Sequence, residues 1–172
     1  MFPEGPASLS LPEVRIRNTT IEVLSVSPHQ DDHNTLERLL HGQNWKVYTI
    51  LSFASAVELL QTIRIPLVVC ERDLLPGTWR DMLDHLTLLP QPPYLIVTCK
   101  FADEHLWAEA LNIGAYDVLA KQFHAAEVDR ILRLAWLHWH DKYDAEIQAP
   151  KTISASTSQM SDVSDGEYKA NQ

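Results

Sequence analysis

Three polar side chains stand at the ends of short apolar runs in this sequence. Glu71 follows one run, Thr98 closes a second, and Lys121 follows a third. If these runs are parallel strands of one sheet, their carboxyl ends share an edge, and open α/β sheets bind ligands outside that edge. A carboxylate, a hydroxyl and an ammonium would then meet in one crevice, where they could pair with one another or bind a small anion.

The strands of that sheet are predicted from five short runs rich in β-branched residues. Several of these runs are apolar at successive positions, as strands covered on both faces must be. We expect strands at residues 21–26, 46–51, 67–70, 94–98 and 116–120.

The segments between the predicted strands carry helical signals. Apolar residues recur there at the spacing of one helix face, and Thr78 is placed to cap a helix. Ser55 and Glu58 have the spacing of a capping box, and Gly114 is a natural left-handed stop. The last helix is predicted over residues 126–139. Strands and helices that alternate with short links predict a doubly wound α/β fold, a parallel sheet with helices on both faces.

The chain is expected to contain one domain between two extensions. Residues 1–18 hold three prolines and no helical or strand period, which indicates a leader. Residues 19–142 form the predicted domain. Residues 143–172 become polar, with few large apolar side chains toward the end, and are predicted to be a disordered tail.

Composition limits the classes of function. The chain has 14 basic and 23 acidic residues, and a net charge of -9 argues against direct nucleic-acid binding. No secretory signal is apparent and no apolar run is long enough for a membrane span. The two cysteines, Cys70 and Cys99, are expected to be buried thiols rather than a redox pair. These features predict a cytoplasmic protein that is not bound to a membrane.

The element order and the strand-end residues resemble the receiver domain of two-component signalling, over about residues 21–139. The likeness is strongest in the apolar run into Thr98, the helix that ends at Gly114, and the run into Lys121. Receivers have Pro where this chain has Gln122. The resemblance implies a five-stranded sheet of the flavodoxin-like order 2-1-3-4-5 and a role in phosphorelay signalling.

The chain departs from that pattern at the residues that carry the chemistry. An active receiver has an acidic pair after its first strand, which holds Mg²⁺, and an Asp that accepts the phosphoryl group. Ser27 and Pro28 stand at the positions of the acidic pair, and Glu71 stands at the acceptor position. We therefore expect poor Mg²⁺ affinity, no cofactor and no enzymatic activity, the features of a pseudo-receiver.

The role of Glu71 has two interpretations. Its longer carboxylate could pair with Lys121, or accept a hydrogen bond from Thr98, and so imitate part of the phosphorylated state permanently. Alternatively, Glu71 and Lys121 are a partly solvated ion pair left from a lost function, worth about 1 kcal/mol or less. The sequence favours neither.

Other carboxylates offer alternatives. Asp31 and Asp32 are predicted in the first turn of a helix, where the helix dipole favours acidic residues; the alternative is that they are displaced metal ligands. Asp73 could be a shifted phosphoacceptor that uses Mg²⁺, but a turn carboxylate is the favoured interpretation. A third hypothesis is a small-anion sensor that uses Thr98 and Lys121.

The last predicted helix is apolar on more than one side. In receivers, the fourth helix, the fifth strand and the fifth helix form the surface that dimerises or docks a partner. On this resemblance, Trp107, Leu134 and Leu137 are candidate contacts, unless the leader or the start of the tail covers them. The sequence predicts a stand-alone atypical receiver that acts through self-association or a protein partner.

Overall fold

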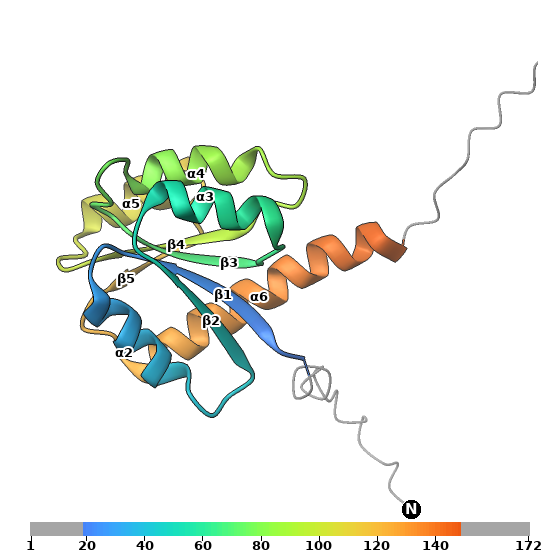
Figure 1. Ribbon diagram of the computed structural model, residues 1–172, viewed down its shortest axis with the longest axis horizontal. Coiled ribbons are helices and arrows are strands. Elements are labelled where there is room, and N and C mark those ends of the chain that lie inside the picture. Colours follow the sequence, from blue (N-terminus) through green and yellow to red (C-terminus); the bar gives the residue numbers. More distant parts are fainter. Residues whose placement is uncertain (1–18, 149–172) are drawn as a thin grey trace, which may run out of the picture.

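The computed structural model describes residues 19–148, and their side chains as far as Tyr143. Five strands and five helices alternate along this part of the chain (Figure 1). The strands are β1 (Ile21–Val26), β2 (Trp45–Ile50), β3 (Leu67–Glu71), β4 (Tyr94–Cys99) and β5 (Asp117–Ala120). The helices are α2 (Gln30–Leu40), α3 (Phe53–Thr62), α4 (Trp79–Thr87), α5 (Glu104–Ile113) and α6 (Ala125–Gln148).

The strands form one parallel sheet in the order β2-β1-β3-β4-β5, which confirms the predicted topology. Every residue of β3 is buried, because this central strand is covered on both faces. The register aligns the carboxyl ends of neighbouring strands, with Glu71 opposite Thr98 and Thr98 opposite Leu119.

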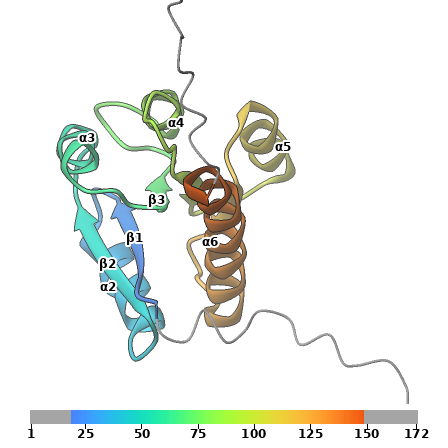
Figure 2. The ribbon, with the colours of Figure 1, turned by 90° about the vertical axis from the view of Figure 1, so that its right-hand side faces the viewer.

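Helices cover both faces of the sheet, so the fold is doubly wound as predicted. Helices α3, α4 and α5 lie on one face, and α2 and α6 lie on the other (Figure 2). Each face of the sheet packs against its helices in a separate hydrophobic core, and alternate strand residues point to one core or the other. Leu24 and Val68 point to the core under α3, α4 and α5, and Val23 and Val69 point to the core under α2 and α6.

The predicted helix signals are confirmed at two positions and wrong at a third. Thr78 caps α4 in a capping box with Asp81, and Gly114 ends α5 with a φ of 111°. The predicted cap at Ser55 is wrong, because Ser52 is the extended residue whose hydroxyl accepts from the Ser55 amide. Ser55 therefore already lies inside the first turn of α3.

The last helix is longer than predicted. It continues past residue 139 to Gln148, and so crosses the predicted domain boundary after residue 142. Tyr143, predicted to lie in the tail, is only 3% exposed and packs against Trp139 at a ring distance of 5.0 Å. The apolar stripe of Trp136, Trp139 and Tyr143 extends the buried side of the helix.

The predicted leader, residues 1–18, and residues 149–172 of the predicted tail lie outside the described residues. Within residues 19–148, none of the helices combines the length and the apolar character needed to cross a bilayer.

Candidate functional site

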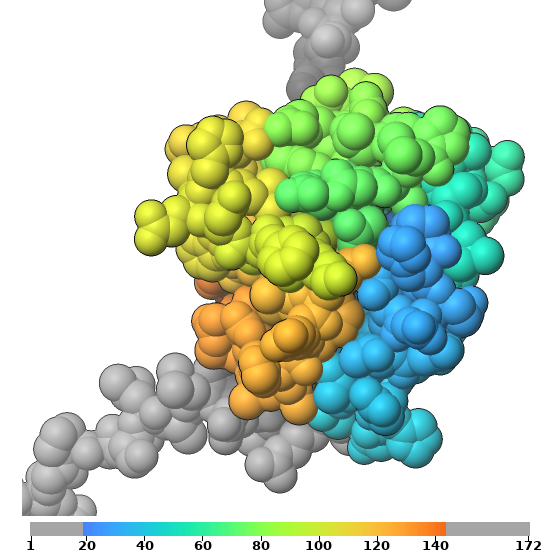
Figure 3. Space-filling model, turned by 90° about the vertical axis from the view of Figure 1, so that its left-hand side faces the viewer, coloured from blue at the N-terminus to red at the C-terminus, as the bar shows by residue number. Residues whose placement is uncertain are grey.

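The candidate site lies at the carboxyl ends of the strands. Segments that follow β1, β3, β4 and β5 meet on this face of the molecule, where blue, green, yellow and orange adjoin (Figure 3). Glu71 is the last residue of β3, Thr98 lies beside it in β4, and Lys121 comes directly after β5. The fold thus brings the predicted carboxylate, hydroxyl and ammonium to one edge of the sheet.

Lys121 is the centre of an ion-pair network. Its Nζ atom lies 2.6 Å from Glu71 Oε2 and 2.7 Å from Asp32 Oδ2. The side chains are mostly shielded from solvent, with exposed fractions of 16% for Lys121, 6% for Glu71 and 17% for Asp32. Burial acts to lower the pKa of Lys121, but its hydrogen bonds to Asp32 and Glu71 outweigh that effect and raise the pKa.

Asp32 enters this network from the first turn of α2, which confirms the predicted helical position. Its Oδ2 atom also accepts a hydrogen bond of 2.5 Å from the Ser27 hydroxyl, and that hydroxyl in turn accepts from the His29 amide at 3.2 Å. Ser27, which stands where an active receiver has one residue of its acidic pair, therefore positions Asp32. The sequence predicted the helical position of Asp32 but not its pairing with Lys121.

His33 fixes the backbone next to this network. It is fully buried, with Nδ1 2.8 Å from the Ser25 hydroxyl and Nε2 2.9 Å from the Ser27 carbonyl oxygen. Because a carbonyl oxygen only accepts, Nε2 carries a proton and donates it to Ser27. His33 thus anchors the turn that presents Ser27 to Asp32. His33 was not among the residues predicted for the site; it lies one helical turn after His29, the N-cap residue of α2.

The remaining predicted positions differ in exposure. Thr98 is buried at 3% exposure, and its carbonyl oxygen accepts from the Arg72 amide at 2.8 Å. Pro28 is exposed on the turn after β1. Thr98 therefore lies at the edge where the network is, whereas Pro28 faces solvent.

The Asp73 carboxylate pairs with Arg72, not with Lys121. The pair is bidentate, at 2.6 Å between Arg72 Nη2 and Asp73 Oδ2, and the Asp73 side chain is 63% exposed. The hydrogen bonds from Arg72 hold the pKa of Asp73 below its usual value. With Arg72, it lines a hollow of 270 Å³ between the first turns of α4 and α5. Only its backbone amide reaches the network, donating to Glu71 Oε1 at 3.3 Å.

The donor set does not fit a Mg²⁺ site. Mg²⁺ requires oxygen ligands in near-octahedral geometry, usually with one or two carboxylates free to bind it. Here the carboxylates of Asp32 and Glu71 both contact the Lys121 ammonium, and a serine and a proline occupy the acidic-pair positions. Across the part of the chain that the structure describes, no group of three or more His, Cys, Asp or Glu side chains is placed to hold a metal ion.

The predicted contact residues lie around the β5 edge of the sheet. Helices α5 and α6 cover opposite faces beside β5, and Trp107 of α5 and Leu134 of α6 are 44% and 40% exposed. Leu137 is partly buried against the core on the α2 and α6 face, so it contributes less surface than Leu134. Leu111, one turn after Trp107, is also exposed at 41%.

The sequence matches no family model and no curated protein. Solved receiver domains nevertheless share its fold. The signal receiver domain of an HD domain-containing protein from Pseudomonas fluorescens Pf-5 has a TM-score of 0.66 at 23% identity, covering 79% of this chain and 98% of that one.

Two further structures have the same architecture. Full-length FixJ from B. japonicum has a TM-score of 0.67 at 17% identity, covering 76% of this chain and 64% of that one. The receiver domain of a sensor histidine kinase from Pseudomonas aeruginosa, solved with a magnesium ion in its active-site cleft, has a TM-score of 0.59 at 20% identity. It covers 67% of this chain and 96% of that one. The chain therefore has the receiver fold.

Proposed function

We propose that this chain is a non-enzymatic signalling domain of the receiver type, in which a permanent ion-pair network replaces the phosphorylation switch. The observation that carries the proposal is the position of Lys121, whose ammonium lies between the carboxylates of Glu71 and Asp32. A ligand that needs this ammonium must first displace two partners, so the crevice is closed by its own side chains.

Phosphorylation in this crevice is disfavoured because the charge-neutralising metal has no prepared ligands. Phosphoryl transfer requires a cation that offsets the charge of the incoming group. The magnesium-bound receiver of Pseudomonas aeruginosa carries such an ion in its cleft. In this chain, Ser27 and Pro28 supply no carboxylate, and Asp73 is held by Arg72 outside the network. These features support poor Mg²⁺ affinity.

Two roles for Glu71 remain distinguishable by experiment. As a permanent imitation of the phosphorylated state, its charge at Lys121 would hold the signalling surface in one conformation. As a remnant, it would only stabilise the fold. Glu71→Gln keeps the shape and removes the charge, so altered self-association or partner binding is expected for the first role and unchanged behaviour for the second.

A small-anion sensor is less well supported. An anion bound by Thr98 and Lys121 would enter a site that already contains the two carboxylates of Asp32 and Glu71, and like charges at such distances repel. A rise in melting temperature with phosphate would favour this alternative, because a ligand that binds the folded state stabilises it.

Signalling is proposed to occur through protein contacts at the α5, β5 and α6 surface, where Trp107, Leu111 and Leu134 are exposed. Trp107→Ala should weaken self-association or partner binding, measured by sedimentation and by binding of the identified partner. Leu51→Ala is the matched control, because Leu51 is 55% exposed at the opposite edge of the sheet, just after β2. Equal effects of the two substitutions would contradict the assignment of this surface.

The proposal is tested by intact mass after incubation with a small-molecule phosphodonor and Mg²⁺. The wild-type chain is expected to show no mass gain. Ser27→Asp/Pro28→Asp/Glu71→Asp serves as the matched variant, since it restores the acidic pair and the shorter acceptor of an active receiver. A wild-type gain that disappears in Asp73→Asn would overturn the proposal in favour of a shifted phosphoacceptor.

A further inference from the structure

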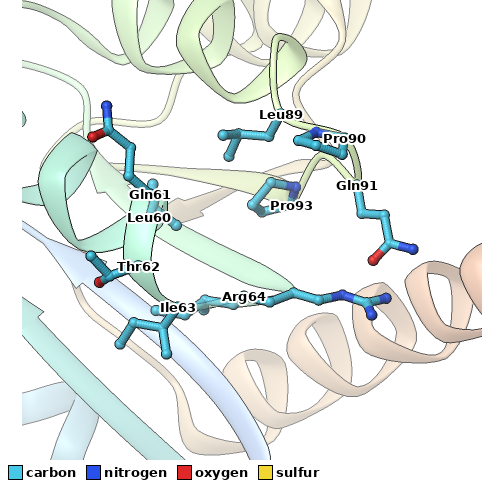
Figure 4. Close-up of a pocket in the computed structure, with 10 residues that line it drawn as sticks. Leu60, Gln61, Thr62, Ile63, Arg64, Leu89, Pro90, Gln91 and Pro93 are labelled. Carbon is cyan, nitrogen blue, oxygen red and sulfur yellow. The ribbon is translucent and has the colours of Figure 1, made fainter.

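A groove at the opposite end of the sheet has no role in the proposed function. It has a volume of 460 Å³ and lies between the end of α3 and the loop from α4 to β4 (Figure 4). Its apolar lining is Leu60, Ile63, Ile65, Leu89, Pro90 and Pro93. Because β3 and β4 begin beside it, the groove is at the amino end of the sheet, away from Lys121.

Arg64 gives the groove an available positive charge. Its guanidinium lies over the Trp139 ring at 4.6 Å, and Figure 4 shows the side chain reaching from the groove toward α6. Among the residues whose side chains the structure describes, no carboxylate is within ion-pair distance of Arg64. An acidic group at the rim would therefore find an open partner there.

The last described helix, α6, passes this groove at Trp139. The Trp139 indole N–H donates to the Pro92 carbonyl oxygen at 3.0 Å, which fixes α6 against the loop that forms one groove wall. Helix α6 then continues for nine residues to Gln148, a rise of about 13 Å. Residues 149–172 start from that point.

Residues 160–168 have the chemistry that the groove would bind. They carry three carboxylates and three larger apolar side chains in nine positions. The carboxylates are Asp162, Asp165 and Glu167, and the apolar residues are Met160, Val163 and Tyr168. The carboxylates complement Arg64, and the apolar residues complement the lining of the groove.

We propose that residues 160–168 dock in this groove of the same chain, with a carboxylate on the Arg64 guanidinium and apolar side chains against the lining. The eleven residues between Gln148 and Met160 span about 20 Å as a random coil, enough to return past the end of α6. A short tether gives an effective concentration on the order of a millimolar, so even weak intrinsic affinity produces substantial docking.

Cysteine cross-linking in the full chain tests this docking. Gln61→Cys, on the exposed rim of the groove, is combined with Ser164→Cys and treated with a short bifunctional thiol reagent. The native thiols interfere little because both are buried, and burial raises the pKa of Cys70 to about 12. Asn34→Cys with Ser164→Cys is the control, since Asn34 is exposed on α2 across the sheet.

The expected result is an intramolecular cross-link several-fold more abundant for the groove pair than for the control pair. Arg64→Gln should reduce it to the control level, whereas Arg38→Gln, an equal change of charge on exposed α2, should not. Asp162→Asn/Asp165→Asn/Glu167→Gln should have the same effect as Arg64→Gln without altering any described residue.

Either of two results would overturn docking of the tail. A yield equal to that of the control pair would show that the groove has another occupant or none. Cross-links between two chains would show that the groove binds a second copy. Neither result would bear on the crevice, because the experiment leaves Lys121, Glu71 and Asp32 unchanged.

Discussion

Lys121 and Arg64 are cations at opposite ends of the same sheet, and their surroundings differ in one decisive respect. Lys121 contacts two carboxylates and is 16% exposed. Arg64 is exposed, stacks on Trp139 and has no carboxylate partner among the residues with described side chains. The end of the sheet that binds ligands in open α/β folds is thus closed here, whereas the other end offers an unpaired charge.

The difference follows from solvation. A buried ammonium without partners is unfavourable, so Lys121 requires the carboxylates that Glu71 and Asp32 supply. An exposed guanidinium keeps its water and can lie on an aromatic ring without an ion pair. Each charge at the crevice is therefore balanced by a partner, whereas the charge at the groove is open for recognition.

Removing the charge of Lys121 should produce the largest effect on stability. Lys121→Met leaves two shielded carboxylates without their cation, which is expected to cost about 4 kcal/mol of unfolding free energy. Lys46→Met is the control, because Lys46 pairs with Glu22 at a solvent-exposed site and should lose much less stability than Lys121→Met. Urea denaturation measures both, and similar losses would mean that the crevice network is as weak as a surface pair.

The same comparison predicts a pH dependence. Because the folded-state pKa of Lys121 is raised above 10.5, its stabilisation is fully present below pH 10.5 and is lost as the pH rises through the raised value. The stability difference between wild type and Lys121→Met should then be constant from neutral pH to about 10 and shrink above 10.5. Denaturation series at these pH values measure it, and a difference that widens at high pH would contradict the assigned pairing.

A smaller loss is expected where α6 extends past the predicted domain end. Tyr143→Ala removes a ring that is 3% exposed and packs on Trp139, at an expected cost of about 3 kcal/mol. Asp141→Ala, on the exposed side of the same turn, should change stability by about 0.5 kcal/mol or less. Equal midpoints for the two variants would place the end of the domain before Tyr143, as the sequence alone suggested.

The contrast between the two ends also explains what the sequence could reveal. The strands were predictable because they are short apolar runs, as in β3 (Leu67–Glu71), which is buried on both faces. The helices were predictable because the spacing of apolar residues along one helix face is a local property of the sequence. That Glu71, Thr98 and Lys121 share one edge of the sheet was predictable from their positions at the strand ends alone. The pairing of Asp32 with Lys121 did not, because it depends on how the first turn of α2 approaches β5.

The groove was not predictable for a related reason. Arg64 and Trp139 are 75 positions apart, and no local pattern places one on the other. The helix end at residue 139 was also predicted too early, since the residues between Trp139 and the buried Tyr143 are polar and obscure the apolar pattern. Local sequence patterns therefore predict where helices and strands lie, whereas the partner of each charged side chain depends on contacts between elements that are distant in the sequence.

The smallest effect is predicted for Arg64. Arg64→Gln removes the stacking of a guanidinium on Trp139, which alone should cost about 0.5–1 kcal/mol in urea denaturation. The proposed docking of residues 160–168 would add to that loss, and Arg38→Gln is the control that changes charge alone. A larger loss would mean that Arg64 has a further partner in the full chain. Repeating the substitution in Asp162→Asn/Asp165→Asn/Glu167→Gln identifies it: if the tail is that partner, the loss falls back to the stacking value. If the loss persists, the partner lies elsewhere and the contrast between Lys121 and Arg64 is weaker than the described residues indicate.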